Sequence, residues 1–153
     1  MAGKVLKWTN GYAGQVSRSI DDIIESFANS DTNPILFGAP VALVSGNVKN
    51  VSTTNTDLIG VAVRTIKTEQ TYGGHDAKYM PNEMVDVIKR GTVCMAVPSA
   101  ATPAAGGTVY VVKATGALAT AADSTNTITT NWKFKGAKDT NNVVEVVLTE
   151  RVF

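Results

Sequence analysis

Cys94 and His75 are the two residues through which this chain could carry out nucleophilic or acid–base chemistry, and each is the only residue of its type. A thiolate needs a neighbouring base to act as a catalytic nucleophile. Cys94 lies in the apolar run VCMAV, which is typical of a buried and inert thiol. His75 lies in the turn-rich segment GGHD, which is typical of a solvated loop. We therefore expect no catalytic residues and no enzymatic activity.

Cofactor and metal sites are not expected either. One cysteine and one histidine cannot supply the four ligands of a structural zinc site. The glycines of NGYAGQ (10–15) lack both the preceding strand and the spacing of a dinucleotide-binding fingerprint. The acidic residues Asp21, Asp22 and Glu25 are explained by a solvated polar face, so they do not indicate a metal site.

Charge and hydropathy exclude several classes of partner. The 14 basic and 13 acidic residues leave a net charge of +1, which is too small to hold nucleic acid or an anionic membrane. No stretch approaches the roughly 18 apolar residues of a membrane helix. The first residues lack the apolar run of a signal peptide, so we expect the protein to stay in the cytoplasm in which it is made.

The N-terminal part of the chain predicts an arm and a short helix. Residues 1–16 place Trp8 and Tyr12 among glycines without a regular period, which favours an extended arm. Ile20, Ile23, Ile24 and Phe27 then recur at helical spacing, which predicts one short α-helix over about 19–29. We accordingly divide the chain into an arm and helix (1–33) and a β-barrel-like domain (34–153).

The remainder predicts a mostly β fold, because short runs of alternating or continuous apolar residues are separated by turn residues. Trp132 and Phe134 alternate with lysines and are expected in the core, while Lys89 and Arg90 are expected on a solvated strand edge. Frequent short strands are typical of a barrel or a sandwich. The expected strands are 35–44, 60–65, 84–90, 92–98, 108–113, 131–136 and 143–150.

Several blocks, taken in order, resemble the structural cement proteins that decorate the heads of tailed bacteriophages. They span nearly the whole chain, and the similarity lies in their order and spacing. The matching blocks are NGYAGQVSR (10–18), ILFGAPVALVSGNVKNV (35–51), DLIGVAVRT (57–65), YMPNEMVDVIKRGTVCMAV (79–97), GGTVYVVKATGAL (106–118) and VVEVVLTERV (143–152).

The resemblance implies a compact β-barrel-like or β-tulip-like domain and assembly as a homotrimer. It also implies attachment to the outer surface of the assembled head, at three-fold and pseudo-three-fold positions of the major capsid lattice, which the protein would stabilise. The candidate capsid-interface residues are Trp8, Tyr12, Val16 and Arg18, because exposed aromatic and arginine side chains are the commonest interface anchors. The residues of the trimer interface are not indicated by the sequence.

Two other functions are compatible with the sequence. A head-fibre or tail-tube subunit would share the β-rich composition. A carbohydrate-binding module of the virion surface could stack sugars on Trp8, Tyr12, Tyr72 or Tyr79.

Overall fold

The structure is a computed structural model, which describes residues 9–65 and 78–149. Within these residues the chain forms strands and turns and no helix, so the prediction of a mostly β fold is confirmed. The strands are β1 (Val16–Ala28), β2 (Ile35–Leu36), β3 (Pro40–Val44), β4 (Asn47–Asn50), β5 (Leu58–Ala62), β6 (Lys78–Tyr79), β7 (Met84–Ala96), β8 (Thr108–Val112), β9 (Leu118–Ala119), β10 (Thr127–Phe134) and β11 (Val143–Leu148).

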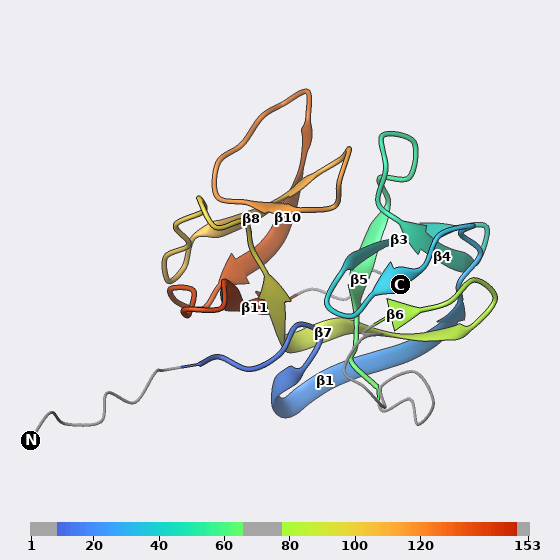
Figure 1. Ribbon diagram of the computed structural model, residues 1–153, viewed down its shortest axis with the longest axis horizontal. Helices are drawn as coiled ribbons and strands as arrows, with labels where there is room; N and C mark the ends of the chain where they lie inside the picture. Colours follow the sequence, from blue (N-terminus) through green and yellow to red (C-terminus); the bar gives the residue numbers. More distant parts are fainter. Residues whose placement is uncertain (1–8, 66–77, 150–153) are drawn as a thin grey trace, which may run out of the picture.

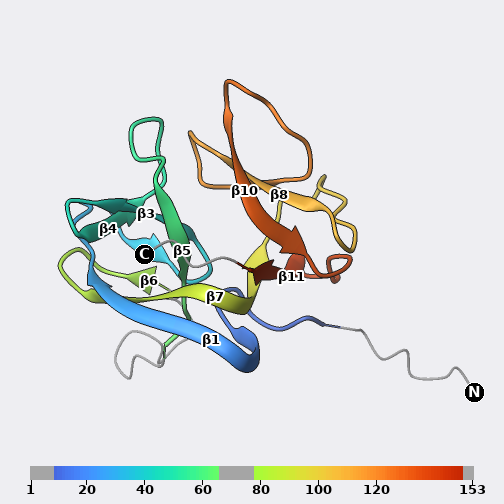
Figure 2. The same ribbon diagram turned by 180° about the vertical axis from the view of Figure 1, so that it is seen from behind.

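The long strand β7 organises the sheet, because three strands pair with it (Figure 1). One edge of β7 pairs with β1. The other edge pairs with β5 at Val87 and Ile88, and then with β11 from Gly91 to Ala96. The sheet therefore forks at Gly91 into two wings, which are β5-β3-β4 and β11-β10-β8-β9, and Figures 1 and 2 show these wings diverging from β7.

Two apolar clusters fill the fold, and β7 contributes to both. Ile88, Val93 and Met95 join the larger cluster, which includes Trp132 and Phe134. Val85 and Val87 join the smaller cluster beneath the two-stranded sheet β2-β6. Trp132 and Phe134 are buried, as their alternation with lysines predicts.

The helix predicted over 19–29 is wrong, because residues 19–28 belong to β1 and Asn29 forms an isolated bridge with Val48. Three isoleucines and a phenylalanine favour a strand as strongly as the spacing favours a helix, and β-branched side chains pack well on a pleated surface. Pairing with β7 decides between the two, since Phe27 lies opposite Val85 and packs against the smaller cluster. Register shifts between Arg18 and Ile24 interrupt the alternation, which explains why no period of two is visible in the sequence.

The predicted strands 84–90 and 92–98 are one element in the structure. Gly91 allows this continuity, because its φ of +127° is a conformation that few other residues adopt. The expectation of a solvated edge is wrong for Lys89, which is 2% exposed and bonded to Glu25 at 3.0 Å. Strand β1 covers this part of β7 and replaces the solvent.

Candidate interaction surface

Residues 10–15 are fastened to the folded domain by hydrogen bonds from both backbone and side chains. The side-chain amide of Asn10 donates to the carbonyl of Val143 at 2.6 Å, and the Cys94 thiol donates to the carbonyl of Asn10 at 3.2 Å. The N–H of Gly14 donates to the carbonyl of Cys94 at 2.8 Å, and the N–H of Cys94 donates to the carbonyl of Gln15 at 2.9 Å. The segment that leads into β1 is therefore part of the domain from Asn10 onward.

Asp139 is the polar centre of this attachment. Its carboxylate accepts from the backbone N–H groups of Asn10, Asn141 and Val143 at 2.8, 2.8 and 3.0 Å. Burial alone would raise the pKa of Asp139, but these three hydrogen bonds outweigh it and hold the pKa below its usual value. The ionised carboxylate thus joins the start of the chain to the turn before β11.

The backbones of Gly14 and Gly38 meet at a close seam. A Cβ atom at Gly14 would lie 2.8 Å from the nitrogen of Gly38 and 2.9 Å from the nitrogen of Arg64. Both glycines have positive φ, of +81° and +78°. The N–H of Arg64 donates to the carbonyl of Gly14 at 2.8 Å, so the seam also connects to the end of β5. Only glycine allows the backbones to approach this closely.

Tyr12 lies just before this seam and is 69% exposed. The Arg64 guanidinium lies over its ring at 5.1 Å and over the ring of buried Phe37 at 5.7 Å. The N–H of Tyr12 also donates to the side chain of Gln15 at 3.1 Å. Tyr12 is therefore a large exposed ring on an anchored backbone, stacked beside a cation.

The other predicted interface residues occupy different environments. Val16 lies opposite Val93 and packs against the larger cluster, which leaves it partly buried. Arg18 is exposed, and its side chain lies 3.8 Å from the Glu145 carboxylate. Trp8 lies outside the described residues. Tyr12, Val16 and Arg18 are neighbours in sequence, but Val16 packs inward whereas Tyr12 and Arg18 are exposed.

Sequence reasoning missed Arg64 and Asp139. Arg64 follows the alternating run GVAV, where a solvated residue is expected, and its stacking on Tyr12 depends on the fold. The segment DTNN (139–142) signals a turn that a carboxylate could cap. Nothing in the sequence indicates that Asn10, which is 129 residues away, is a partner.

The structure places the Cys94 thiol in a buried environment. Its side chain is buried as predicted, and burial, followed by the charge of Glu145, raises the pKa of the thiol to about 11. His75 lies outside the described residues. Among residues 9–65 and 78–149 no group of three or more histidine, cysteine and acidic side chains is placed to hold a metal ion. Nor does any helix in that part of the chain have the length and apolar character to cross a bilayer.

Tyr79 is not a platform for sugars, because it is 2% exposed. Its hydroxyl donates to the carbonyl of Val63 at 2.5 Å, and its ring meets Phe37 edge-on with centroids 5.1 Å apart. Tyr72 lies outside the described residues. Of the aromatic residues named for carbohydrate binding, Tyr12 is the one that the structure shows to be exposed.

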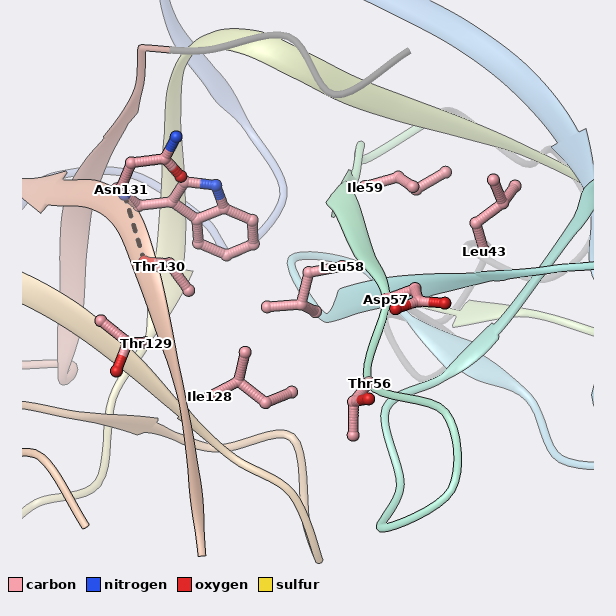
Figure 3. Close-up of a pocket in the computed structure, with 10 residues that line it drawn as sticks. Leu43, Thr56, Asp57, Leu58, Ile59, Ile128, Thr129, Thr130 and Asn131 are labelled. Carbon is pink, nitrogen blue, oxygen red and sulfur yellow. Dashed lines mark hydrogen bonds between the residues drawn. The ribbon is translucent and has the colours of Figure 1, made fainter. Parts of the chain in front are cut away.

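A groove of about 350 Å³ lies between the two wings, at the fork of the sheet (Figure 3). Leu58 from β5 and Ile128 from β10 reach into it from opposite sides. Trp132 is part of its lining, and Thr56, Asp57, Thr129, Thr130 and Asn131 supply polar atoms. The groove is apolar in its middle and polar at its rim.

Comparison with known proteins identifies the family to which the chain belongs. Residues 4–149 match the model of the family described as "Structural cement protein (E217 gp24/Pam3 gp6)". The chain belongs to this family, and it is therefore a structural protein of the phage virion that associates with the capsid.

A solved structure shares the fold. A chain of the structure described as "The capsid of Myoviridae Phage XM1" superimposes with a TM-score of 0.79 and 20% sequence identity, over 99% of each chain. A search of curated proteins finds no match.

Proposed function

We propose that this protein is a non-enzymatic decoration protein that binds the outer surface of the assembled phage head and stabilises it. It binds as a homotrimer, at three-fold and pseudo-three-fold positions of the major capsid lattice. It needs no cofactor or metal, has neither nucleic acid nor membrane as a partner, and is made in the host cytoplasm. Membership of the cement family supports this proposal.

The observation that carries the proposal is the exposed Tyr12 ring on a fixed backbone. Tyrosine and arginine dominate the binding energy of protein interfaces, and both are present here in contact. Because hydrogen bonds already order residues 10–15, docking costs little conformational freedom. Trp8 lies four residues before Tyr12 in the sequence, and we propose that it adds a second aromatic anchor.

Stabilisation of the head follows from multivalent binding to the assembled lattice. Three weak footprints on one rigid trimer reinforce one another, and the resulting avidity exceeds that of a single footprint by roughly 10²–10⁴-fold. A protein that binds the assembled shell and not its free subunits stabilises the shell by mass action. Heads carrying the protein should therefore resist heat better than heads without it.

Binding of purified protein to undecorated heads tests the role of Tyr12. Tyr12→Ala should weaken binding at least about tenfold, the loss expected when one anchor is removed. Met84→Ala is the matched control, because Met84 is 58% exposed and lies opposite Ala28, at the other end of β1 from Val16. Equal binding by the wild type and Tyr12→Ala would refute the assignment of this surface.

A further inference from the structure

Asn10 and Gly11 form the only asparagine–glycine pair in the sequence. In such a pair the amide nitrogen of the glycine attacks the side-chain carbonyl carbon of the asparagine, because glycine has no Cβ atom to obstruct the approach. The reaction is intramolecular and needs neither an enzyme nor a cofactor. Asparagine is accordingly one of the thermally labile residues of proteins. The pair therefore has the chemistry of a self-modification site.

The reaction converts the neutral side chain into a carboxylate in two steps. In the first, a bond forms between the Gly11 nitrogen and Cγ of Asn10, the bond from Cγ to Nδ2 breaks, and the Gly11 proton leaves with the amide group as ammonia. In the second, water adds to either carbonyl carbon of the succinimide ring, and the bond from that carbon to the ring nitrogen breaks. The nitrogen takes one proton from water, and the new carboxylic acid loses the other at neutral pH. The products are aspartate and isoaspartate.

The folded chain holds Asn10 in a state that resists the first step. Its Nδ2 donates to the carbonyl of Val143 at 2.6 Å and to the carbonyl of Ala137 at 3.3 Å. Its backbone N–H donates to the Asp139 carboxylate at 2.8 Å. Because the first step removes Nδ2, both side-chain hydrogen bonds must break. The reaction therefore proceeds from a locally opened segment and not from the closed one.

The product does not fit where the amide lay. A carboxylate has no N–H group, so its oxygens would meet the carbonyl oxygens of Val143 and Ala137. Asp139, which three backbone N–H groups hold in its ionised form, adds a second negative charge beside the same residue. In isoaspartate the backbone is also longer by a methylene group. Facing acceptors and like charges both oppose closure, so the modified segment does not return to its place.

We propose that Asn10–Gly11 is a self-deamidation site, and that its conversion to aspartate or isoaspartate releases residues 10–15 from the domain. Cys94 lies under this segment, because its thiol donates to the carbonyl of Asn10 at 3.2 Å and a Cβ atom at Gly11 would lie 3.4 Å from its sulfur. The Cys94 side chain is buried in the closed form, so release exposes the thiol. Tyr12 lies on the same segment and loses its fixed backbone with it. This inference does not depend on how the protein binds the capsid.

Peptide mass spectrometry of the purified full-length chain, incubated at neutral pH, measures the conversion. The native protein should convert Asn10 at least about tenfold more slowly than the chain unfolded in guanidinium chloride, because the closed segment protects it. Asp139→Asn should speed the native reaction and leave the rate in denaturant unchanged, since it weakens the attachment of residue 10.

Gly46→Ala is the matched control for this variant. Gly46 lies in the turn between β3 and β4, so the change costs stability without touching residues 10–15 and should leave the native rate unchanged. Absence of conversion in the native chain, or equal rates with and without denaturant, would overturn the proposal. Equal acceleration by Asp139→Asn and Gly46→Ala would also overturn it, because Asn10 would then react from the globally unfolded chain.

Labelling of Cys94, the only cysteine, by a maleimide tests the release. Asn10→Asp reproduces the aspartate product, and Asn10→Ala removes the amide without adding a charge. Cys94 should react at least about tenfold faster in Asn10→Asp than in the wild type. In Asn10→Ala it should react more slowly than in Asn10→Asp, because only the carboxylate is repelled by the attachment site. Equal labelling of these two variants, or labelling of Asn10→Asp as slow as that of the wild type, would overturn the proposal.

Discussion

The behaviour of single residues in this protein depends on contacts that are remote in the sequence. Asp139 accepts a hydrogen bond from Asn10 across 129 positions, and Gly14 meets the backbone of Gly38. Composition and periodicity identify which residues are apolar, but they carry no information about such pairs. The burial of Trp132 and Phe134 could be predicted from their alternation with lysines, and that of Cys94 from its apolar neighbours, because both patterns are local.

The close approach of backbones at Gly14 can be tested against Gly46, a second glycine with nearly the same φ angle. Gly46 has a φ of +80°, and a Cβ atom there would meet nothing within 4 Å. Gly46→Ala should cost about 1–2 kcal/mol of unfolding free energy from conformation alone. Gly14→Ala should cost about 1–3 kcal/mol more, because its Cβ overlaps backbone atoms. Urea unfolding measures both, and equal losses would mean that the backbones at the seam separate freely.

Asp139 gives the stability a defined pH dependence. Its folded-state pKa lies below the ordinary value of 3.8, so the ionised form stabilises the fold above that pH. This contribution is lost as the pH falls from about 3.8 through the lower folded-state pKa. Asp139→Asn should reduce the unfolding free energy at pH 7 by about 1–3 kcal/mol, because it weakens hydrogen bonds to a charged acceptor.

The same variant supplies the control for the pH effect. The difference in melting temperature between the wild type and Asp139→Asn should be constant from pH 7 to about pH 5 and should narrow as the pH falls toward 3. A difference between the two proteins that stays constant down to pH 3 would show that the carboxylate is not the group that titrates.

The effect of pH on stability through Asp22 is opposite in sign to the effect through Asp139. Burial, with the nearby charge of Asp21 as a second cause, raises the pKa of Asp22, and its buried Oδ1 atom has no hydrogen-bond partner among residues 9–65 and 78–149. The ionised form therefore destabilises the fold at neutral pH, and this cost disappears as the pH falls through the raised pKa. Asp22→Asn should raise the melting temperature at pH 7 and have no such effect near pH 3. A lower melting temperature at pH 7 would contradict this account.

At the scale of elements, β1 shows where sequence reasoning reaches its limit. The spacing of its isoleucines fits a helix, and only the long partner strand β7 makes the extended conformation the better one. β8 and β11 lie within the predicted strands 108–113 and 143–150, because their apolar runs are bounded by turn residues, whereas β5 and β10 overlap the predicted strands 60–65 and 131–136 only in part. The short strands β4, β6 and β9 carry too few residues for any pattern to show.

Among the described residues, the side-chain hydrogen bonds that fasten the segment before β1 begin at Asn10. Removing residues 2–8 leaves in place the hydrogen bonds that the described residues Asn10, Gly14 and Gln15 make with the domain, so the melting temperature should stay nearly unchanged. If Trp8 is an anchor, binding to undecorated heads should weaken at least about tenfold. Trp8→Ala in the full chain should reproduce most of this loss. Binding as tight as that of the intact chain would remove Trp8 from the interface.

At the scale of the whole molecule, a sheet that forks at Gly91 packs two apolar clusters on a single central strand. The sequence predicts the class of this fold but not the fork, because the divergence of β5 and β11 from β7 is set by tertiary packing. The candidate site was anticipated in part. Tyr12 could be named as an exposed aromatic, whereas its stacking on Arg64 depends on the seam.

The proposed homotrimer has a direct test in solution. Light scattering of the purified chain should give a mass near three times 16.1 kDa at micromolar concentration. A mass of 16.1 kDa across that range would contradict the multivalent account of head stabilisation.

A cryo-EM map of heads decorated with the wild-type protein tests the central claim most directly. The account predicts three copies around each three-fold and pseudo-three-fold position, on the outside of the shell. In every copy the surface formed by Tyr12 and Arg64 should contact the major capsid protein. A map in which Tyr12 points to solvent, while another surface of the protein contacts the shell, would contradict the account.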